Sequence, residues 1–337
     1  MAHLENVLAG EVYLVFDGAM GTMLQRSGLA AGELPELLCL TDPNSITAIH
    51  RAYVEAGSQA VTTNTFGANR LKLGGAASVD EVFEAAVRCA RESGAAYVAA
   101  DIGPTGELMS PMGDLEFSEA FDLFAEQAVA AEKASADLVI IETMADVLEM
   151  TAAVLAVKAS CSLPVFATMT FTASGRTFLG TGPRDAALVL AALGVDALGV
   201  NCSAGPADLR PVVEEMLEVA SCPVIVQANA GLPEVVDGVT SYALPPADYA
   251  AAILPMIEAG ATVVGGCCGT DPDYMREVAK LVASRTPTRK PVPAERMREL
   301  AHTAADQGGR DAEILEMVLG ATDWASLKEA LCEEYDD

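Results

Sequence analysis

The sequence predicts an α/β protein built as a (β/α)8 TIM barrel with a short C-terminal helical appendage. Short runs rich in Val, Ile and Ala recur eight times, and a longer segment with helical periodicity follows each run. The runs begin about 27 to 47 residues apart, the length of a strand, a loop and a helix. Eight such units close most simply into a barrel. A doubly wound open sheet is the alternative.

The predicted strands and helices can be placed in order along the chain. Gly57 stops the first clear helix, and polar or glycine-rich residues follow almost every strand. In a parallel barrel these residues converge on the rim at the carboxyl ends of the strands, where active sites are built. The predicted strands are 12–16, 59–63, 97–100, 137–141, 165–169, 197–200, 224–227 and 262–265, and the plainest helices are 45–56, 117–134, 146–159 and 208–220.

Composition divides the chain into three parts: a barrel over 1–285, a Pro-rich linker over 286–294 and an acidic tail over 295–337. The stretch TPTRKPVPAERM has three prolines and few apolar residues, as is typical of a linker. The tail holds twelve acids against four bases. It predicts two amphipathic helices, 294–306 and 311–335, separated by Gly308-Gly309. We expect the tail either to pack on the barrel or to dock a partner.

The charge of the chain excludes some partners. Lys and Arg number 20 against 48 Asp and Glu, and a formal charge of -28 repels nucleic acid and anionic membranes. The first residues lack the features of a signal peptide, and no apolar run reaches about 18 residues without a charge. We therefore expect a cytoplasmic protein whose cysteines are thiols or metal ligands rather than disulfides.

Three of the eight cysteines fall on the predicted rim. Cys267 and Cys268 are adjacent in a glycine-flanked turn after the last strand, and Cys202 ends the sixth strand. Three thiolates from two strand ends would bind Zn²⁺ and leave its fourth position open, as a catalytic zinc requires. The alternative is that these cysteines are small apolar side chains in a crowded core. That alternative is favoured for the five other cysteines, namely Cys39, Cys89, Cys161, Cys222 and Cys332.

An open zinc site with thiolate ligands favours a sulfur substrate, whose thiol would bind as the thiolate. Hydrolysis is disfavoured, because none of His3, His50 and His302 ends a predicted strand. We therefore expect attack by a thiolate, with no catalytic residue beyond the metal site.

Two acids and a loop indicate the shape of that substrate. Asp17 and Glu142 end the first and fourth strands and could accept hydrogen bonds from an ammonium group. The loop that begins with Gly18 and Ala19 opens a helix, and its amides could receive a carboxylate. An N-cap role for Asp17 and a solvated strand end for Glu142 are the alternatives. Together with the thiolates, these groups describe a thiol-bearing amino acid.

Seven motifs in order carry a resemblance to a known family. They are DGAMGT, TNTFGANRLKL, DIGPTGEL, IETMADVLEMTAAVLAVK, ALGVNCSAGP, QANAGLP and GGCCGT. From about Leu14 to Lys280 the chain resembles the homocysteine S-methyltransferase family, most closely the homocysteine-binding barrel of its cobalamin-dependent branch, methionine synthase.

The resemblance implies roles for individual residues. It implies that Cys202, Cys267 and Cys268 bind zinc and that Asp17 and Glu142 contact the amino group of homocysteine. Asn201 and Asn229 match further rim positions that contact substrate.

The resemblance also implies a methyl donor. We expect methylcobalamin, supplied by a separate corrinoid protein, because the short acidic tail matches neither the folate-binding barrel nor the cobalamin-binding module of the full enzyme. The expected product is methionine. The alternatives are a methyltransferase that uses S-methylmethionine, another donor or another thiol, and a noncatalytic zinc or redox module.

Overall fold

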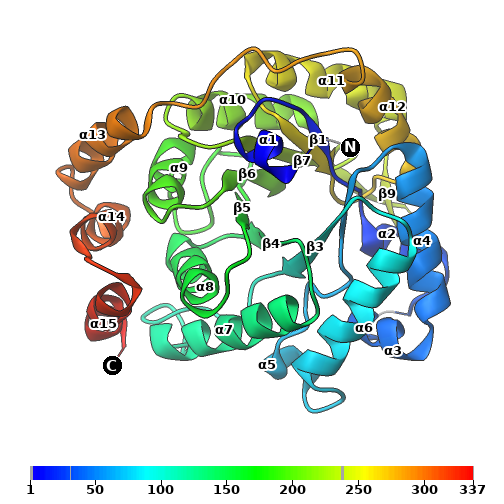
Figure 1. Ribbon diagram of the computed structural model, residues 1–337. Coiled ribbons are helices and arrows are strands. Elements are labelled where there is room, and N and C mark those ends of the chain that lie inside the picture. The colour runs from blue at the N-terminus through cyan, green and yellow to red at the C-terminus, as the bar shows by residue number, and fades with distance from the viewer. Residues whose placement is uncertain (1–2, 31, 237–238, 337) are drawn as a thin grey trace.

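The computed structural model describes residues 3–30, 32–236 and 239–336. Eight parallel strands form the barrel in the order β1-β10-β7-β6-β5-β4-β3-β2. The two ends of this sheet meet where the Gln59 amide donates to the Val15 carbonyl at 2.8 Å. Figure 1 views the barrel from the amino ends of its strands, with the helices in a ring around it. The TIM-barrel prediction is therefore confirmed.

Each predicted apolar run overlaps a strand of the barrel, although several strands continue further toward the rim than expected. Strand β3 extends to Ile102, β4 to Met144 and β6 to Cys202, so Asp101, Glu142 and Cys202 lie within strands. The barrel strands are β1 Leu14–Val15, β2 Ala60–Thr62, β3 Tyr97–Ile102, β4 Leu138–Met144, β5 Val165–Met169, β6 Ala197–Cys202, β7 Val224–Ala228 and β10 Val263–Gly266.

The main outer helices follow these strands along the chain. They are α4 Pro43–Ala56, α6 Val79–Glu92, α7 Phe117–Lys133, α8 Val147–Ser160, α9 Pro183–Ala192, α10 Pro206–Leu217, α11 Pro246–Ala259 and α12 Pro272–Val282. Short helices complete the barrel at α1 Leu4–Leu8, α2 Met20–Arg26, η1 Pro35–Leu37, α3 Leu38–Thr41 and α5 Arg70–Leu73. Among the described residues, none of the helices has both the length and the apolar character needed to cross a membrane.

Alternate strand residues fill the inside of the barrel. The rings of Phe16 and Phe166 meet there with centroids 6.1 Å apart, and Val7 of α1 closes the amino end. Because side chains alternate along a strand, the inward positions nearer the carboxyl ends follow directly above this apolar layer. The amino-terminal half of the barrel interior is thus a packed apolar core. Polar side chains can therefore occupy the interior only near the carboxyl ends of the strands.

A hairpin that the sequence did not predict follows β7. Strands β8 Pro233–Val236 and β9 Val239–Tyr242 pair antiparallel and form a separate two-stranded sheet. Because the hairpin lies in the loop between β7 and α11, it belongs to the carboxyl rim.

The tail forms three helices rather than the two predicted: α13 Ala294–Ala305, α14 Arg310–Gly320 and α15 Trp324–Tyr335. The predicted second helix breaks because Ala321 is extended and Asp323 begins a new helix through a capping box with Ser326. Figure 1 shows the three helices outside α9, α8 and α7. The predicted barrel begins at Met1 and the predicted tail ends at Asp337, but Met1, Ala2 and Asp337 lie outside the described residues.

The tail explains why α8 has no polar face. Every residue from Val147 to Val157 in this helix is buried. A helix that is apolar all round must be covered on all sides. The barrel covers one side of α8, and α7, α9 and α15 cover the others.

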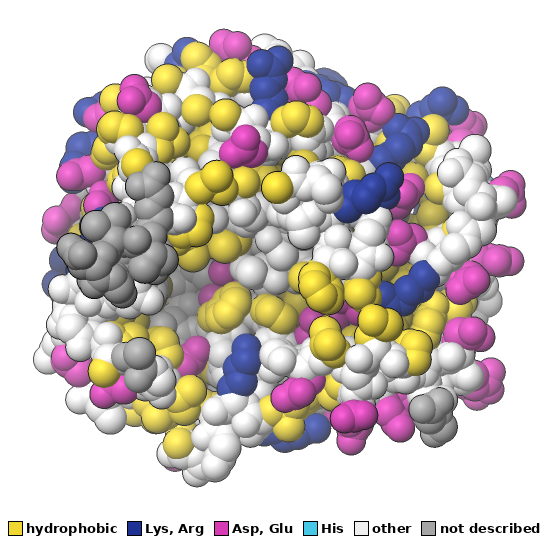
Figure 2. Space-filling model, turned by 180° about the vertical axis from the view of Figure 1, so that it is seen from behind, with side chains coloured by type: hydrophobic (Ala, Val, Ile, Leu, Met, Phe, Trp, Pro, Cys, Tyr) yellow, Lys and Arg dark blue, Asp and Glu magenta, His cyan; other side chains and the backbone are white. Residues whose placement is uncertain are grey.

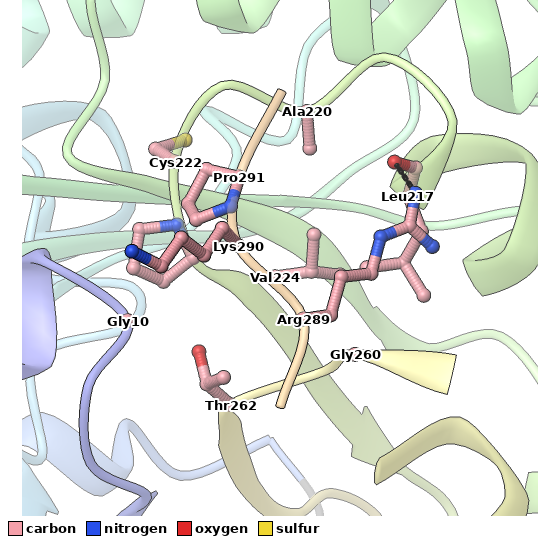
Figure 3. Close-up of a pocket in the computed structure, with 11 residues that line it drawn as sticks. Gly10, Leu217, Ala220, Cys222, Val224, Gly260, Thr262, Arg289, Lys290 and Pro291 are labelled. Atoms are coloured by element: carbon pink, nitrogen blue, oxygen red, sulfur yellow. Dashed lines mark hydrogen bonds between the residues drawn. The ribbon is translucent and has the colours of Figure 1, made fainter. Parts of the chain in front are cut away.

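The linker crosses the amino end of the barrel, opposite the rim. Figure 3 shows the guanidinium of Arg289 directed toward Leu217. It donates to the carbonyls of Leu217 and Ala259 at 2.5 and 3.1 Å. These carbonyls lie at the C-terminal ends of α10 and α11, where the last carbonyls of a helix need donors from outside it. The small pocket beside Arg289 is therefore a packing feature, remote from the carboxyl rim.

Candidate active site

Three thiols meet at the rim. Cys202 ends β6, and Cys267 and Cys268 follow β10, with β7 between them. The three Sγ atoms all lie within 4.8 Å of one another, and those of Cys202 and Cys268 are 3.8 Å apart. The structure thus brings together the three cysteines that the sequence placed on one rim.

The backbone around the thiols is shaped to bring them together. Cys202 has a left-handed φ of 56°, which turns the chain at the end of β6. Gly266 has no room for a side chain, since a Cβ would lie 2.4 Å from the Thr270 hydroxyl. That hydroxyl donates to the Cys267 carbonyl at 2.7 Å and holds the turn closed.

The cluster fits a zinc ion. Sulfurs bound about 2.3 Å from a tetrahedral zinc lie roughly 3.8 Å apart, which matches the Cys202–Cys268 separation. Across residues 3–30, 32–236 and 239–336, no His or carboxylate joins the three sulfurs in this cluster. The donor set is therefore three thiols with a fourth position open, the arrangement suited to a zinc that binds substrate.

Asp17 lies at the mouth of the barrel and is only 2% exposed. Its carboxylate accepts hydrogen bonds from the Thr62 amide and the Thr62 hydroxyl, both at 2.9 Å. Burial raises the pKa of Asp17 to about 7, although the two hydrogen bonds oppose that shift. Thr62 thus fixes the orientation of Asp17, a role that sequence spacing did not reveal.

Glu142 lies on β4, and burial together with the charges of Asp17 and Cys268 raises the pKa of Glu142 to about 8. The following residue, Thr143, has a left-handed φ of 62°. Its amide donates to the Asn201 side-chain oxygen at 2.8 Å, and the Asn201 amide group donates to the Thr143 hydroxyl at 2.7 Å. Asn201 therefore clamps the chain next to Glu142.

The remaining predicted contacts differ in their surroundings. Ala19 donates its amide to the Thr270 hydroxyl at 3.3 Å, and Gly18 lies so close to the same hydroxyl that a Cβ would be 2.5 Å away. These two residues pack on the turn that carries the thiols. Asn229 is buried after β7, and its side-chain oxygen has no partner in the described part of the chain.

Two further residues at the site were not among the predicted site residues, although Gln227 opens the QANAGLP motif. Tyr242, at the end of β9, lies beside Cys268, and its ring lies against Gly269. Gln227 is buried on β7, and its side-chain oxygen lacks a partner among the described residues. No sequence signal marked Tyr242, because the hairpin that carries it was not predicted.

Fold and site together define a barrel enzyme with a thiol cluster and two acids at its mouth. A family model described as homocysteine S-methyltransferase matches residues 14–282, and the chain belongs to that family. This confirms the resemblance predicted from the motifs.

The chain is similar to parts of longer proteins. Methionine synthase from Mycobacterium tuberculosis (strain ATCC 25618 / H37Rv) is 37% identical over 304 residues, covering 83% of this chain and 25% of that protein. Methionine synthase from Mycobacterium leprae (strain TN) is 36% identical over 293 residues, covering 80% and 24%. The chain therefore spans about a quarter of the length of these relatives.

Solved structures are also similar. The homocysteine methyltransferase MmuM from Escherichia coli in its oxidized form has a TM-score of 0.68 and 21% identity, covering 80% of this chain and 95% of that one. Its metallated form has a TM-score of 0.67 and 22% identity, covering 80% and 96%. This similarity supports the barrel fold.

Proposed function

We propose that the chain transfers a methyl group from a methylated corrinoid, carried by a separate protein, to the thiol of homocysteine, giving methionine. One observation carries the proposal: three thiols with an open fourth position lie beside the acids Asp17 and Glu142. Cys202, Cys267 and Cys268 would hold zinc. The three thiols must stay reduced, which favours the cytoplasm.

Bound zinc would lower the pKa of the homocysteine thiol and present it as a thiolate. The chain's own residues then fix the amino acid. Asp17, held by Thr62, and Glu142, held beside the Asn201 clamp, would accept hydrogen bonds from the ammonium group. Asn229 offers a buried oxygen without a partner in the described chain, and Gly18 and Ala19 shape the mouth next to the thiols.

A protein-bound donor is supported by the surface around the mouth. Five of the eight large hydrophobic side chains that are exposed among the described residues lie on rim loops or the short helix α5: Leu71, Leu108, Met112, Phe178 and Leu232. Figure 2 shows this face, where hydrophobic side chains surround a hollow. Exposed apolar patches mark interaction sites. A corrinoid is too bulky to enter a barrel whose interior is filled by side chains near the amino ends of the strands. The protein that carries it would therefore have to dock at the carboxyl rim.

The donor can be tested directly. The zinc-loaded chain is incubated with homocysteine and either free methylcobalamin or S-methylmethionine, and methionine is measured by mass spectrometry. We expect methionine from methylcobalamin. Efficient turnover of S-methylmethionine with none of methylcobalamin would refute the corrinoid donor, and a chain that forms a reversible disulfide instead of binding zinc would support the redox module.

The docking surface has a separate test. Phe178→Ser should slow methyl transfer from a methylated corrinoid protein while leaving transfer from free methylcobalamin unchanged, because Phe178 is exposed on the loop after β5. Val129→Ser is the matched control, since Val129 is exposed on α7. Equal rates for both variants and the wild type with the protein-bound donor would place docking elsewhere.

A further inference from the structure

Asp101 occupies an inward position at the carboxyl end of β3. Ala99, two residues earlier, belongs to the apolar core inside the barrel, whereas Ala100 and Ile102 pack in the outer core between strands and helices. Because side chains alternate, Asp101 points into the barrel directly above Ala99. Its side chain therefore lies at the base of the mouth, on the strand next to the one that carries Glu142.

The backbone of Asp101 is held firmly, but its side chain is not satisfied. The Asp101 amide donates to the Thr63 hydroxyl at 3.0 Å, and the Thr65 hydroxyl donates to the Asp101 carbonyl at 2.7 Å. Asp101 is 5% exposed, and its Oδ1 atom has no hydrogen-bond partner in the part of the chain that is described. A buried acceptor without a donor is costly, so this oxygen indicates a ligand that donates.

The surroundings of Asp101 are rich in negative charge. Burial and the charges of Glu142, Asp17 and Glu36 raise the pKa of Asp101 well above its ordinary value. Lys72 opposes this shift, but its Nζ atom already donates to the Pro104 carbonyl at 2.8 Å. The mouth thus gathers three carboxyl groups, from β1, β3 and β4, around one space.

We propose that Asp101 is a third acceptor for the ammonium group of the thiol substrate, beside Asp17 and Glu142. This inference rests on the proposed function. A primary ammonium has three N–H donors, and three carboxyl groups on three strands give each donor one acceptor. Asp101 would then make the site selective for thiol acids that carry a free primary amine.

The test uses calorimetry on the zinc-loaded chain with two ligands. Homocysteine and 4-sulfanylbutanoic acid share the thiol and the carboxylate, but only homocysteine has the amine. Asp101→Asn should weaken homocysteine about ten- to a hundredfold, as loss of a charged hydrogen bond does, and leave 4-sulfanylbutanoic acid unchanged. Glu149→Gln is the control, because the buried Glu149 carboxylate already accepts from the amide and hydroxyl of Thr105. It should change neither affinity.

A second measurement needs no variant. With three acceptors, each N-methyl group added to homocysteine removes a donor that the wild type uses, so N-methyl and N,N-dimethyl homocysteine should bind progressively more weakly. Unchanged binding of N-methylhomocysteine would overturn the role of Asp101, and so would an equal loss of both calorimetry ligands in Asp101→Asn. If wild type binds homocysteine but Asp101→Asn matches it, only this inference fails. If zinc-loaded wild type binds neither ligand, the proposed function fails as well.

Discussion

His50 lies on α4 next to Asp17 and is fully buried. Its Nδ1 atom is 4.0 Å from Asp17 Oδ2, and neither ring nitrogen has a hydrogen-bond partner among the described residues. Burial lowers the pKa of His50 to about 4. The residue is therefore a neutral packing group next to Asp17.

That burial predicts a pH dependence of stability. The unfolded chain protonates His50 near pH 6.5, whereas the folded chain resists protonation until about pH 4, so the free energy of unfolding falls as pH drops through this window. The contribution is about 2 kcal/mol at pH 5. Denaturant unfolding of wild type and His50→Gln at pH 7 and pH 5 checks this. Wild type should lose more stability than the variant, and parallel losses would contradict the burial argument.

Because Asp17 and Glu142 lie outside the thiol cluster, the proposed function predicts that substrate binding and zinc binding can be lost separately. Asp17→Asn and Glu142→Gln should each weaken homocysteine about tenfold or more while zinc content stays at one per chain, because only the thiols form the metal cluster. Metal analysis and homocysteine calorimetry on the same samples measure both. Cys267→Ala is the opposite control and should lose zinc. Loss of zinc from the acid variants would assign these acids to the metal site instead.

Strand packing inside the barrel leaves no room at Gly199 of β6. A Cβ there would lie 2.1 Å from the Ile225 carbonyl oxygen of β7. Gly199→Ala should therefore lower the free energy of unfolding by about 1–3 kcal/mol. Gly21→Ala is the matched control, since nothing lies within 4 Å of its Cβ position in α2. It should be neutral or stabilising by up to about 1 kcal/mol, and equal effects would contradict the β6–β7 contact.

The alternation of strands and helices along the chain could be predicted from the sequence, because apolar runs and helical periodicity indicate which residues are buried. The rim position of Cys202 and Cys267 followed from the same pattern. The clamp made by Asn201 was not predictable, because its partners Thr143 and Thr168 are distant in sequence and meet it only in the closed barrel. The β8–β9 hairpin was missed because its four-residue strands form no part of the barrel sheet.

The C-terminal tail contacts the rim loops as well as the outer helices. Arg310 donates two hydrogen bonds to Asp146, which caps α8, at 2.8 and 3.1 Å. The Thr181 hydroxyl donates to Asp311 at 2.8 Å. These contacts join α14 to the loops after β4 and β5. The tail thus packs on the barrel, one of the two roles that the sequence left open.

Deleting residues 294–337 should therefore destabilise the barrel. The deletion would expose α8 and remove Leu331, which is buried in the main core. We expect the melting temperature to fall by about 10 °C or more, or the protein to aggregate. Val129→Ala, at a side chain that is 49% exposed, should leave the melting temperature unchanged. A truncated chain with the wild-type melting temperature would contradict the structural role of the tail.

The proposed function requires homocysteine to bind through its sulfur at the open position of a three-cysteine zinc site. X-ray absorption at the zinc edge tests it most directly, on the full chain with and without homocysteine. We expect three sulfur neighbours from the protein at about 2.3 Å and a fourth after homocysteine is added. A sulfur count that does not change when homocysteine is bound would contradict it.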